Sequence, residues 1–170
     1  MGRYRPPQKP GSKYITPEGH RRLEEELNFL WKQQRPKVTQ AVREAAAQGD
    51  RSENAEYIYG KKQLREIDRR VRFLRQRLDH ITVVDSAPRD PSSIYFGAWV
   101  KLKDEMENIQ RYRIVGPDEI DPAQGYISID SPVATALMKK SVGDEILVHT
   151  PSGEVAMFVV AIDYDNGNFD

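Results

Sequence analysis

The residues with the clearest capacity for chemistry lie in "GDRSENAEY", residues 49–57. This stretch carries Asp50, Glu53 and Glu56 beside a helix-breaking glycine, with no apolar residue before its alanine. Carboxylate oxygens are natural ligands of Mg²⁺, which commonly takes one or two protein acids and keeps several waters. Asp50 and Glu53 are therefore a candidate metal-binding and catalytic pair.

A long helix is predicted before this stretch, over residues 17–47. Thr16 followed by Pro17 is typical of a helix start, because a hydroxyl can cap it and proline lacks an N–H that would otherwise need a partner. Pro36 should bend the helix or break it locally, and Gly49 stands where a C′ glycine would end it. Apolar residues recur at three- and four-residue intervals on both sides of the proline: Leu23, Leu27, Leu30, Val38, Val42 and Ala45.

A second helix follows, and its apolar positions alternate spacings of three and four: Tyr57, Gly60, Leu64, Ile67, Val71, Leu74, Leu78 and Ile81. A pattern sustained over more than three heptads indicates a coiled-coil seam. So short a connection makes the two helices antiparallel. The first helix would span about 46 Å at 1.5 Å per residue, so the acids lie at the tip of a long hairpin, residues 14–85.

Helix capping offers another explanation of the same acids. An acid at the N-cap with glutamate three residues later forms a capping box, and acids in a first turn favour the helix dipole. Asp50 with Glu53 fits this arrangement, and Ser52 would cap equally well. Capping does not explain why the turn lies at the end of a long, stiff hairpin.

A row of cations follows the tip along one face of the second helix: Lys61, Arg65, Arg69 and Arg72. Such a row could hold the phosphate backbone of a nucleic acid. The alternative is a solvated or salt-bridged helix face. Four further cations on this helix (Lys62, Arg70, Arg75 and Arg77) add to the charge, and Glu66 and Asp68 offset it only partly.

Charge is divided between the two halves of the 170-residue chain, although its formal sum is zero. Residues 1–90 hold 20 Lys and Arg against 13 Asp and Glu (20 − 13 = +7), and residues 91–170 hold 6 against 13 (6 − 13 = −7). Opposed halves suggest two domains with different partners, the basic one facing nucleic acid or another acidic surface. An accident of two surfaces would give the same numbers.

Other functional classes find little support in the sequence. The chain has no cysteine, which removes disulfides and thiolate chemistry and suits a cytosolic protein. Its longest apolar run, residues 155–162, is far shorter than the roughly 18 residues of a membrane span. Residues 1–13 are basic and rich in proline and glycine without an apolar core, so a disordered tail is expected rather than a signal peptide. His20, His80 and His149 lack a metal-binding spacing and should lie at the surface.

The second half shows the period of β-strands. Residues 86–93 are predicted to be a linker, and residues 94–170 a domain. Strands are expected in "YFGAWVKL", "RYRIVG", "GYISID", "EILVHT" and "EVAMFVVAIDY". A short helix in "SPVATALMKK" should open with Ser131 as cap and Pro132 in its first turn. Five strands and one helix predict a small α+β domain with a mainly antiparallel sheet and no candidate active site.

Several segments together resemble the Gre family of transcript cleavage factors of bacterial RNA polymerase. They are "LNFLWKQQRPKV", "GDRSENAEYIYGKKQLREIDRRVRFL", "FGAWV", "YRIVGPDEI" and "YISIDSPVATALMKKSVGDE". The resemblance covers about residues 14–165, and the tip with its following basic helix is its most specific part. Arg51 and the basic helix favour the GreB branch of the family.

The resemblance implies a coiled-coil hairpin and an FKBP-like domain without isomerase function. The hairpin would enter the secondary channel of backtracked polymerase. There Asp50 and Glu53 would lie beside the polymerase's catalytic Mg²⁺ and help bind a second Mg²⁺ and a water, and Ser52 would orient the water or the tip. The basic row would hold the nascent RNA 3′ end. The protein would have no cofactor of its own and would act as a cytoplasmic monomer. The FKBP-like domain would dock on the rim coiled coil of the polymerase through Asp130, Ser131, Pro132, Val133 and Ala134.

Two other functions remain open at this point. A polymerase-channel inhibitor could use the same scaffold without promoting cleavage, although the intact Asp50 and Glu53 count against it. A prolyl isomerase is suggested by the implied fold of residues 91–170, and a peptide isomerisation assay would distinguish it.

Overall fold

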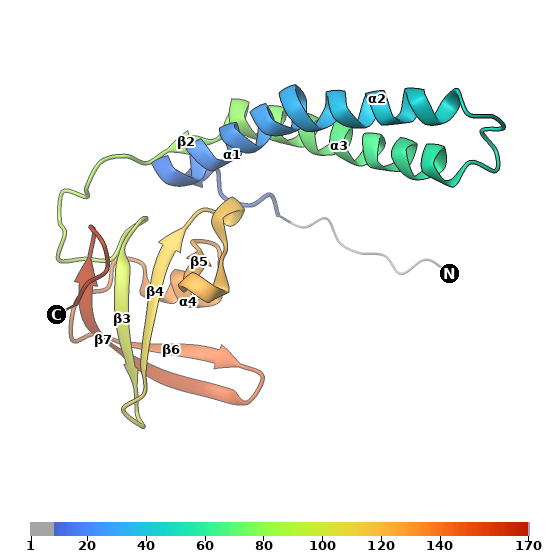
Figure 1. Cartoon of the computed structure of the whole chain (residues 1–170). Helices are drawn as coiled ribbons and strands as arrows, with labels where there is room; N and C mark the ends of the chain where they lie inside the picture. The colour runs from blue at the N-terminus through green and yellow to red at the C-terminus, as the bar shows by residue number, and fades with distance from the viewer. Residues whose placement is uncertain (1–8, 170) are drawn as a thin grey trace. The chain divides into compact units, whose positions relative to one another are not determined.

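The computed structural model describes residues 9–169, which form two compact units. One unit is Glu18–Ile81, and the other joins the segment up to Pro17 to the chain from Thr82 onward (Figure 1). Residues 1–8 of the predicted disordered tail lie outside the described part of the chain. Within the described part, no helix is both long and apolar enough to cross a membrane.

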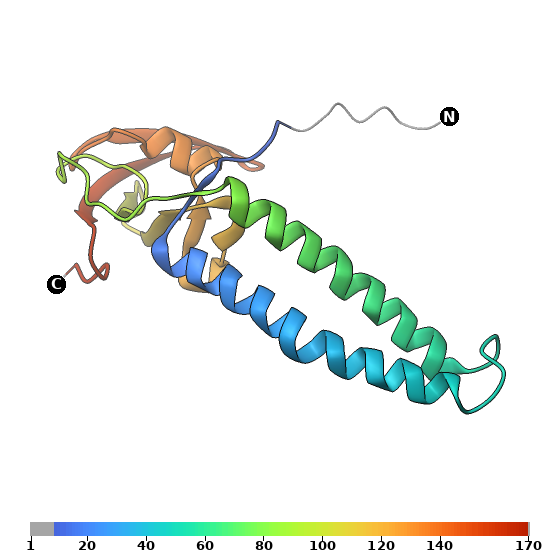
Figure 2. The ribbon, with the colours of Figure 1, turned by 90° about the horizontal axis from the view of Figure 1, so that it is seen from above.

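The first unit is the predicted antiparallel helical hairpin. Its first arm contains α1 (Pro17–Phe29), a π-helical segment η1 (Leu30–Gln34) and α2 (Arg35–Ala46). Its second arm is the single helix α3 (Ala55–His80), which runs beside the first arm (Figure 2). The predicted helix start at Pro17 is confirmed.

The predicted seam of α3 is confirmed. Ile67, Val71 and Leu74 are buried, and Val38 of α2 packs against the first two. Gly60 is buried as well, and a Cβ added there would lie 2.7 Å from a methyl group of Val42. The glycine therefore lets the two helices approach each other closely near the tip.

The π-helical segment explains how the first arm accommodates Pro36. Along this arm the seam residues Leu30 and Val38 are eight apart, one more than two turns of a coiled coil contain. The N–H of Arg35 donates to the carbonyl of Leu30, five residues earlier, so the extra residue is absorbed in a wider turn. The predicted local break near Pro36 is confirmed, and its form is a π-helical turn just before the proline.

The second unit contains all five predicted strands. They are β3 (Trp99–Asp104), β4 (Ile109–Val115), β5 (Tyr126–Ser128), β6 (Glu145–Thr150) and β7 (Gly153–Asp163). Their order is β5-β4-β3-β7-β6, and every neighbouring pair is antiparallel except β4 with β5. The sheet is therefore mixed but mainly antiparallel, as predicted. Two short 3₁₀ helices, η2 (Pro117–Glu119) and η3 (Pro122–Gln124), lie between β4 and β5.

The α-helix described in this unit, α4 (Pro132–Leu137), opens with the predicted cap. The Oγ atom of Ser131 accepts a hydrogen bond of 3.2 Å from the N–H of Ala134. The helix is shorter than the expected segment because the chain reverses at Lys139, where φ is +66° and the N–H donates to the carbonyl of Ile94.

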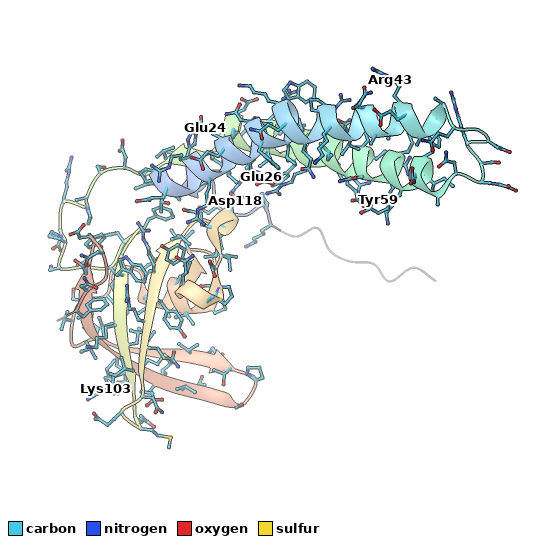
Figure 3. The ribbon with its side chains drawn as sticks, in the orientation of Figure 1. Glu24, Glu26, Arg43, Tyr59, Lys103 and Asp118 are labelled. Carbon is cyan, nitrogen blue, oxygen red and sulfur yellow. The ribbon has the colours of Figure 1, made fainter. Side chains whose placement is uncertain are left out.

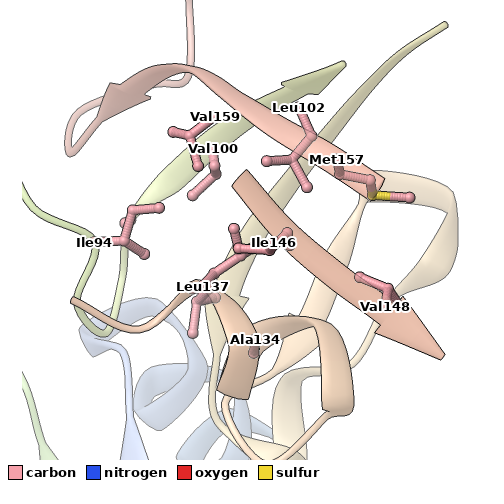
Figure 4. Close-up of a cluster of buried hydrophobic side chains, with 11 residues drawn as sticks. Ile94, Val100, Leu102, Ala134, Leu137, Ile146, Val148, Met157 and Val159 are labelled. Carbon is pink, nitrogen blue, oxygen red and sulfur yellow. The ribbon is translucent and has the colours of Figure 1, made fainter. Parts of the chain in front are cut away.

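The core of the second unit lies between the sheet and α4. Ala134 and Leu137 of the helix pack with strand residues, and none of the core side chains is more than 8% exposed (Figure 4). The strand and loop members are Ile94, Ala98, Val100, Leu102, Ile114, Ile146, Val148, Met157 and Val159. One contiguous core makes this unit a domain in its own right.

A second, two-stranded sheet revises the predicted domain boundaries. Strands β1 (Tyr14–Ile15) and β2 (Thr82–Val83) pair in parallel and belong to the second unit, not to the hairpin as predicted. The N–H of Ser12 donates to Asp130, so the disorder predicted for residues 1–13 is wrong for this end of the tail.

Buried Glu119 holds strand β1 in place. Its carboxylate accepts hydrogen bonds from the N–H and hydroxyl of Thr16 and from the N–H of Gly116. Gly116 lies so close to the strand that an added Cβ would meet the carbonyl oxygen of Tyr14 at 2.1 Å. Because a buried carboxylate needs such donors, Glu119 and β1 stabilise each other.

Candidate functional site

The two arms of the hairpin are joined by an exposed loop, residues 47–54. Helix α2 ends at Ala46 with Ala47 as its C-cap, so the C′ position belongs to Gln48. The prediction of Gly49 as the C′ residue is therefore wrong by one position. Gly49 has φ of +138°, a conformation that favours glycine and turns the chain into the loop.

Asn54 is the residue that closes the loop. Its Oδ1 accepts a hydrogen bond of 3.1 Å from the N–H of Tyr57, which makes it the N-cap of α3. Its Nδ2 donates to the carbonyl oxygen of Ala45 in α2, at 2.7 Å. One side chain thus binds the end of one helix and the start of the next.

The capping explanation is wrong for Asp50 and Glu53. Asn54, and neither Asp50 nor Ser52, caps α3, so Glu53 cannot be the N3 residue of a capping box. Asparagine ranks among the strongest N-cap residues, and its position just before the helical run was the signal that could have identified it.

Asp50 has a different local role. Its Oδ1 accepts hydrogen bonds from the N–H of Ser52 at 2.9 Å and from its hydroxyl at 2.8 Å. These bonds lower the pKa of Asp50 below its usual value, so the group is ionised at neutral pH. The turn orients Ser52 through Asp50. Arg51, next to both, lies over the ring of Tyr57, with its Cζ 5.7 Å from the ring centroid.

Glu53 has no comparable structural role. The side chains of Asp50, Glu53 and Glu56 are all exposed, and no ion pair within residues 9–169 involves any of them. The sticks at the free end of the hairpin, beyond Arg43 and Tyr59, belong to this region (Figure 3). Nowhere in the described chain do three or more acidic or histidine side chains gather closely enough to hold a metal. Asp50, Glu53 and Glu56 are therefore exposed acids that do not by themselves form a metal site among the described residues.

The predicted basic row lies on α3. Arg65, Arg69 and Arg72 are exposed, and Lys61 is half-buried. None of the four belongs to an ion pair among residues 9–169. The row therefore keeps its charge available for an anion.

Two other cations of the hairpin are neutralised by acids of the opposite arm. Arg70 binds Glu26 of α1 through two hydrogen bonds, of 2.6 and 2.9 Å. Arg35 binds Asp68 at 2.7 Å and, more weakly, at 3.5 Å. These pairs join the two arms of the hairpin outside its apolar seam.

The predicted docking residues lie around the start of α4. Asp130 and Pro132 are exposed, and Ser131 and Val133 are half-buried. The side chain of Ala134 is completely buried in the core, so it is unavailable for docking, and the prediction is wrong for this residue. Asp130 also accepts the hydrogen bond from the N–H of Ser12, at 2.8 Å.

The three histidines offer no second site. His80 and His149 are exposed, as predicted, whereas the side chain of His20 is only 28% exposed. His149 contacts Glu154, its cross-strand neighbour, at 3.2 Å, and His20 contacts Glu24 at 3.5 Å. All three histidines therefore reach the surface, His20 less than the other two.

Comparisons with known proteins cover almost the whole chain. Family models described as "Transcription elongation factor, N-terminal" and "Transcription elongation factor, GreA/GreB, C-term" match residues 13–83 and 89–164. Transcription elongation factor GreB of Pseudomonas aeruginosa is 62% identical over 164 residues, covering 96% of this chain and 98% of that protein. GreB of Yersinia pestis is 59% identical, with 90% of each chain covered.

A GreA/GreB structure from Nitrosomonas europaea is 22% identical, with a TM-score of 0.42, and covers 92% of this chain and 100% of that one. The identity to the two GreB proteins and the two family matches carry the assignment. The chain belongs to the GreA/GreB family of transcription elongation factors.

Proposed function

We propose that this transcription elongation factor stimulates RNA polymerase to cleave the nascent RNA 3′ end in backtracked complexes. The observation that carries the proposal is the tip loop, where Asp50 and Glu53 are exposed and belong to no ion pair among residues 9–169, while Asn54 caps the helix. Carboxylates freed from capping at the end of a hairpin suit delivery of negative charge into a partner's active site.

In this proposal the hairpin enters the secondary channel of the polymerase, which owns the catalytic site. Two exposed carboxylates, one of them held ionised by its bonds to Ser52, fit the oxygen ligands that Mg²⁺ prefers. Asp50 and Glu53 would hold the Mg²⁺, which when bound supplies an activated water and neutralises developing charge. Ser52, fixed by Asp50, would orient the water or the loop.

The remaining parts would position the complex. Lys61, Arg65, Arg69 and Arg72 would hold the extruded RNA through its phosphates. The exposed part of the α4 start, Asp130 with Pro132, would dock on the rim coiled coil of the polymerase. The protein would work as a cytoplasmic monomer and would contribute ligands to the polymerase rather than act as an enzyme by itself.

A stalled elongation complex, labelled at the RNA 3′ end and supplied with Mg²⁺, tests the proposal. Addition of the protein should release short labelled 3′ fragments. Polymerase binding without fragment release would instead indicate a channel inhibitor, and release by the protein without polymerase would indicate an enzyme in its own right.

A further inference from the structure

The face of α3 that carries the basic row continues into a hollow of about 350 Å³ on the hairpin. Arg72 belongs both to the row and to the hollow, so the two are continuous. The residues that line it and matter here are Trp31, Arg35, Asp68, Arg72, Arg75 and Gln76. Trp31 comes from the π-helical segment of the first arm and does not belong to the apolar seam.

Trp31 forms the wall of the hollow together with two guanidinium groups. The Cζ atom of Arg75 lies 4.4 Å from the Trp31 ring centroid, and that of Arg35 lies 5.1 Å from it. Asp68 binds Arg35 and so fixes one of the two. Trp31 still remains 42% exposed. The hollow therefore presents an exposed indole next to two guanidinium groups, and its wall is partly apolar and partly cationic.

Charge in the hollow favours an anionic partner. Arg35 and Asp68 neutralise each other, and Asp79 is the other acid lining the hollow. Arg72 and Arg75 carry two positive charges against the one negative charge of Asp79, so the hollow has a net positive charge of one. The amide of Gln76 can donate and accept hydrogen bonds at once.

We infer that this hollow binds an unpaired base of single-stranded RNA, with Trp31 and Arg75 as the stacking surface and the basic row on the flanking phosphates. Proteins that bind single strands combine a cationic track with aromatic rings or guanidinium planes on which bases stack. The inference rests on the proposed RNA track and adds a base-binding position to it. Gln76 is placed to bond the base edge.

The position of the hollow sets when it would be used. Arg75 lies twenty residues after Ala55, the first residue of α3, hence about 30 Å along the helix. A stacked strand advances about 3.4 Å per nucleotide, so up to about nine nucleotides separate the two points. RNA that enters from the tip would reach Trp31 only after deep backtracking.

A binding measurement on the full-length protein tests the inference without the polymerase. Trp31 and Trp99 are the two tryptophans, so in a Trp99→Phe background the fluorescence reports Trp31 alone. The probes are a short oligoadenylate RNA and an abasic strand of equal length, which keeps the phosphates and lacks the bases. Oligoadenylate should quench Trp31 and bind tighter than the abasic strand by about fivefold or more, the lower end of base–aromatic stacking.

Variants read by labelled-probe anisotropy provide the controls. Trp31→Ala should remove the preference for oligoadenylate, and Trp31→Tyr should restore most of it. Phe73→Ala is the matched control, because Phe73 is 44% exposed and has a guanidinium, that of Arg70, 5.2 Å from its ring centroid. Phe73 lies two residues before Arg75, about 200° around α3, so its loss should leave the preference unchanged.

Three results would overturn the inference. If Trp31→Ala weakened the binding of both strands equally, Trp31 would only position the arginines and would not stack on a base. Tighter binding of a polyglutamate peptide than of RNA would indicate an acidic protein partner. Failure of both strands to bind would rule out RNA binding by the basic row as well as by the hollow. The role of the tip is tested separately, by the cleavage activity of Glu53 variants.

Discussion

The helical hairpin and the sheet unit bury their side chains to different extents. Among the described residues, the sheet unit has one cluster of eleven buried hydrophobic side chains, whereas the hairpin has a cluster of three. Two helices share only one seam, so most hairpin side chains face solvent. The difference implies that core substitutions in the sheet unit should cost more stability than seam substitutions in the hairpin.

The hairpin compensates for its narrow seam with polar contacts between its arms. Arg70 with Glu26 and Arg35 with Asp68 are partly exposed pairs, and such pairs contribute about 0–1 kcal/mol each. Asn54 adds a contact at the tip. These contacts fix the geometry of the hairpin more than they add stability.

The largest stability effect is expected from Leu137→Ala in the sheet unit. Leu137 is completely buried, and leucine-to-alanine changes in cores cost about 2–5 kcal/mol. Leu64→Ala in the half-buried hairpin seam should cost clearly less. Denaturant unfolding, followed by Trp99 fluorescence in a Trp31→Phe background for the sheet unit and by helix content for the hairpin, measures both. A larger loss for Leu64→Ala would reverse the comparison of the two units.

The largest functional effect is expected from the tip, without a matching loss of stability. Glu53→Gln removes a charge from a side chain that forms no ion pair, so stability should stay within about 0.5 kcal/mol. Stimulated cleavage should fall at least about 100-fold, since even outer partners of metal ligands alter affinity or activity by about 10–100-fold. Cleavage rates on stalled complexes and thermal unfolding measure the two quantities.

Asp50→Asn sharpens the same test, because the asparagine oxygen can still accept the bonds from Ser52. Loss of cleavage by this variant would show that cleavage requires the negative charge of Asp50 and not only the turn that Asp50 forms. Glu56→Gln, at an exposed acid in the first turn of α3, is the control and should cleave normally. Normal cleavage by both Glu53→Gln and Asp50→Asn would rule out the ligand role.

A smaller stability effect is expected where the N-terminal strand joins the sheet unit. Glu119→Gln keeps the shape of the side chain but replaces an acceptor of three bonds, which should cost about 1–3 kcal/mol. Hydrogen exchange at the amide of Thr16 should accelerate together with the loss of stability. Glu105→Gln, on an exposed turn, should change neither. Unchanged exchange at Thr16 would show that β1 is held by its other contacts.

Local patterns predicted most of the fold. The α3 seam follows a strict three–four spacing, and the strand β6 (Glu145–Thr150) matches its sequence segment residue for residue. Long-range partners could not be read from such patterns. Pairing of Tyr14–Ile15 with Thr82–Val83 brings together segments separated by the whole hairpin, and two-residue strands have no period.

The residues of the candidate site stay a prediction, and their local geometry could not be predicted from the sequence. Asp50, Ser52 and Glu53 were selected by residue type, yet competing caps within six residues made the helix start ambiguous. The sequence held a signal for Asn54 as the cap, but its second bond, to Ala45 across the loop, could be seen only in the structure. The buried position of Ala134 was likewise invisible, since it depends on α4 packing on the sheet.

The smallest expected effect separates the two bonds of Asn54. Serine caps helices about as well as asparagine, so Asn54→Ser should keep the start of α3 and lose only the bond to Ala45, worth about 0.5–1.5 kcal/mol. Asn54→Ala loses both bonds and should cost about 0.5–2 kcal/mol more than that, the usual cost of a lost cap.

Because the bond to Ala45 ties the two arms together, Asn54→Ser should also loosen the loop and slow cleavage a few-fold, although Asp50 and Glu53 are intact. Thermal unfolding, cleavage rates and amide exchange over residues 47–54 measure these quantities. Full cleavage with faster exchange would mean that the loop is ordered by the polymerase, and that the tip of the hairpin need not be rigid beforehand.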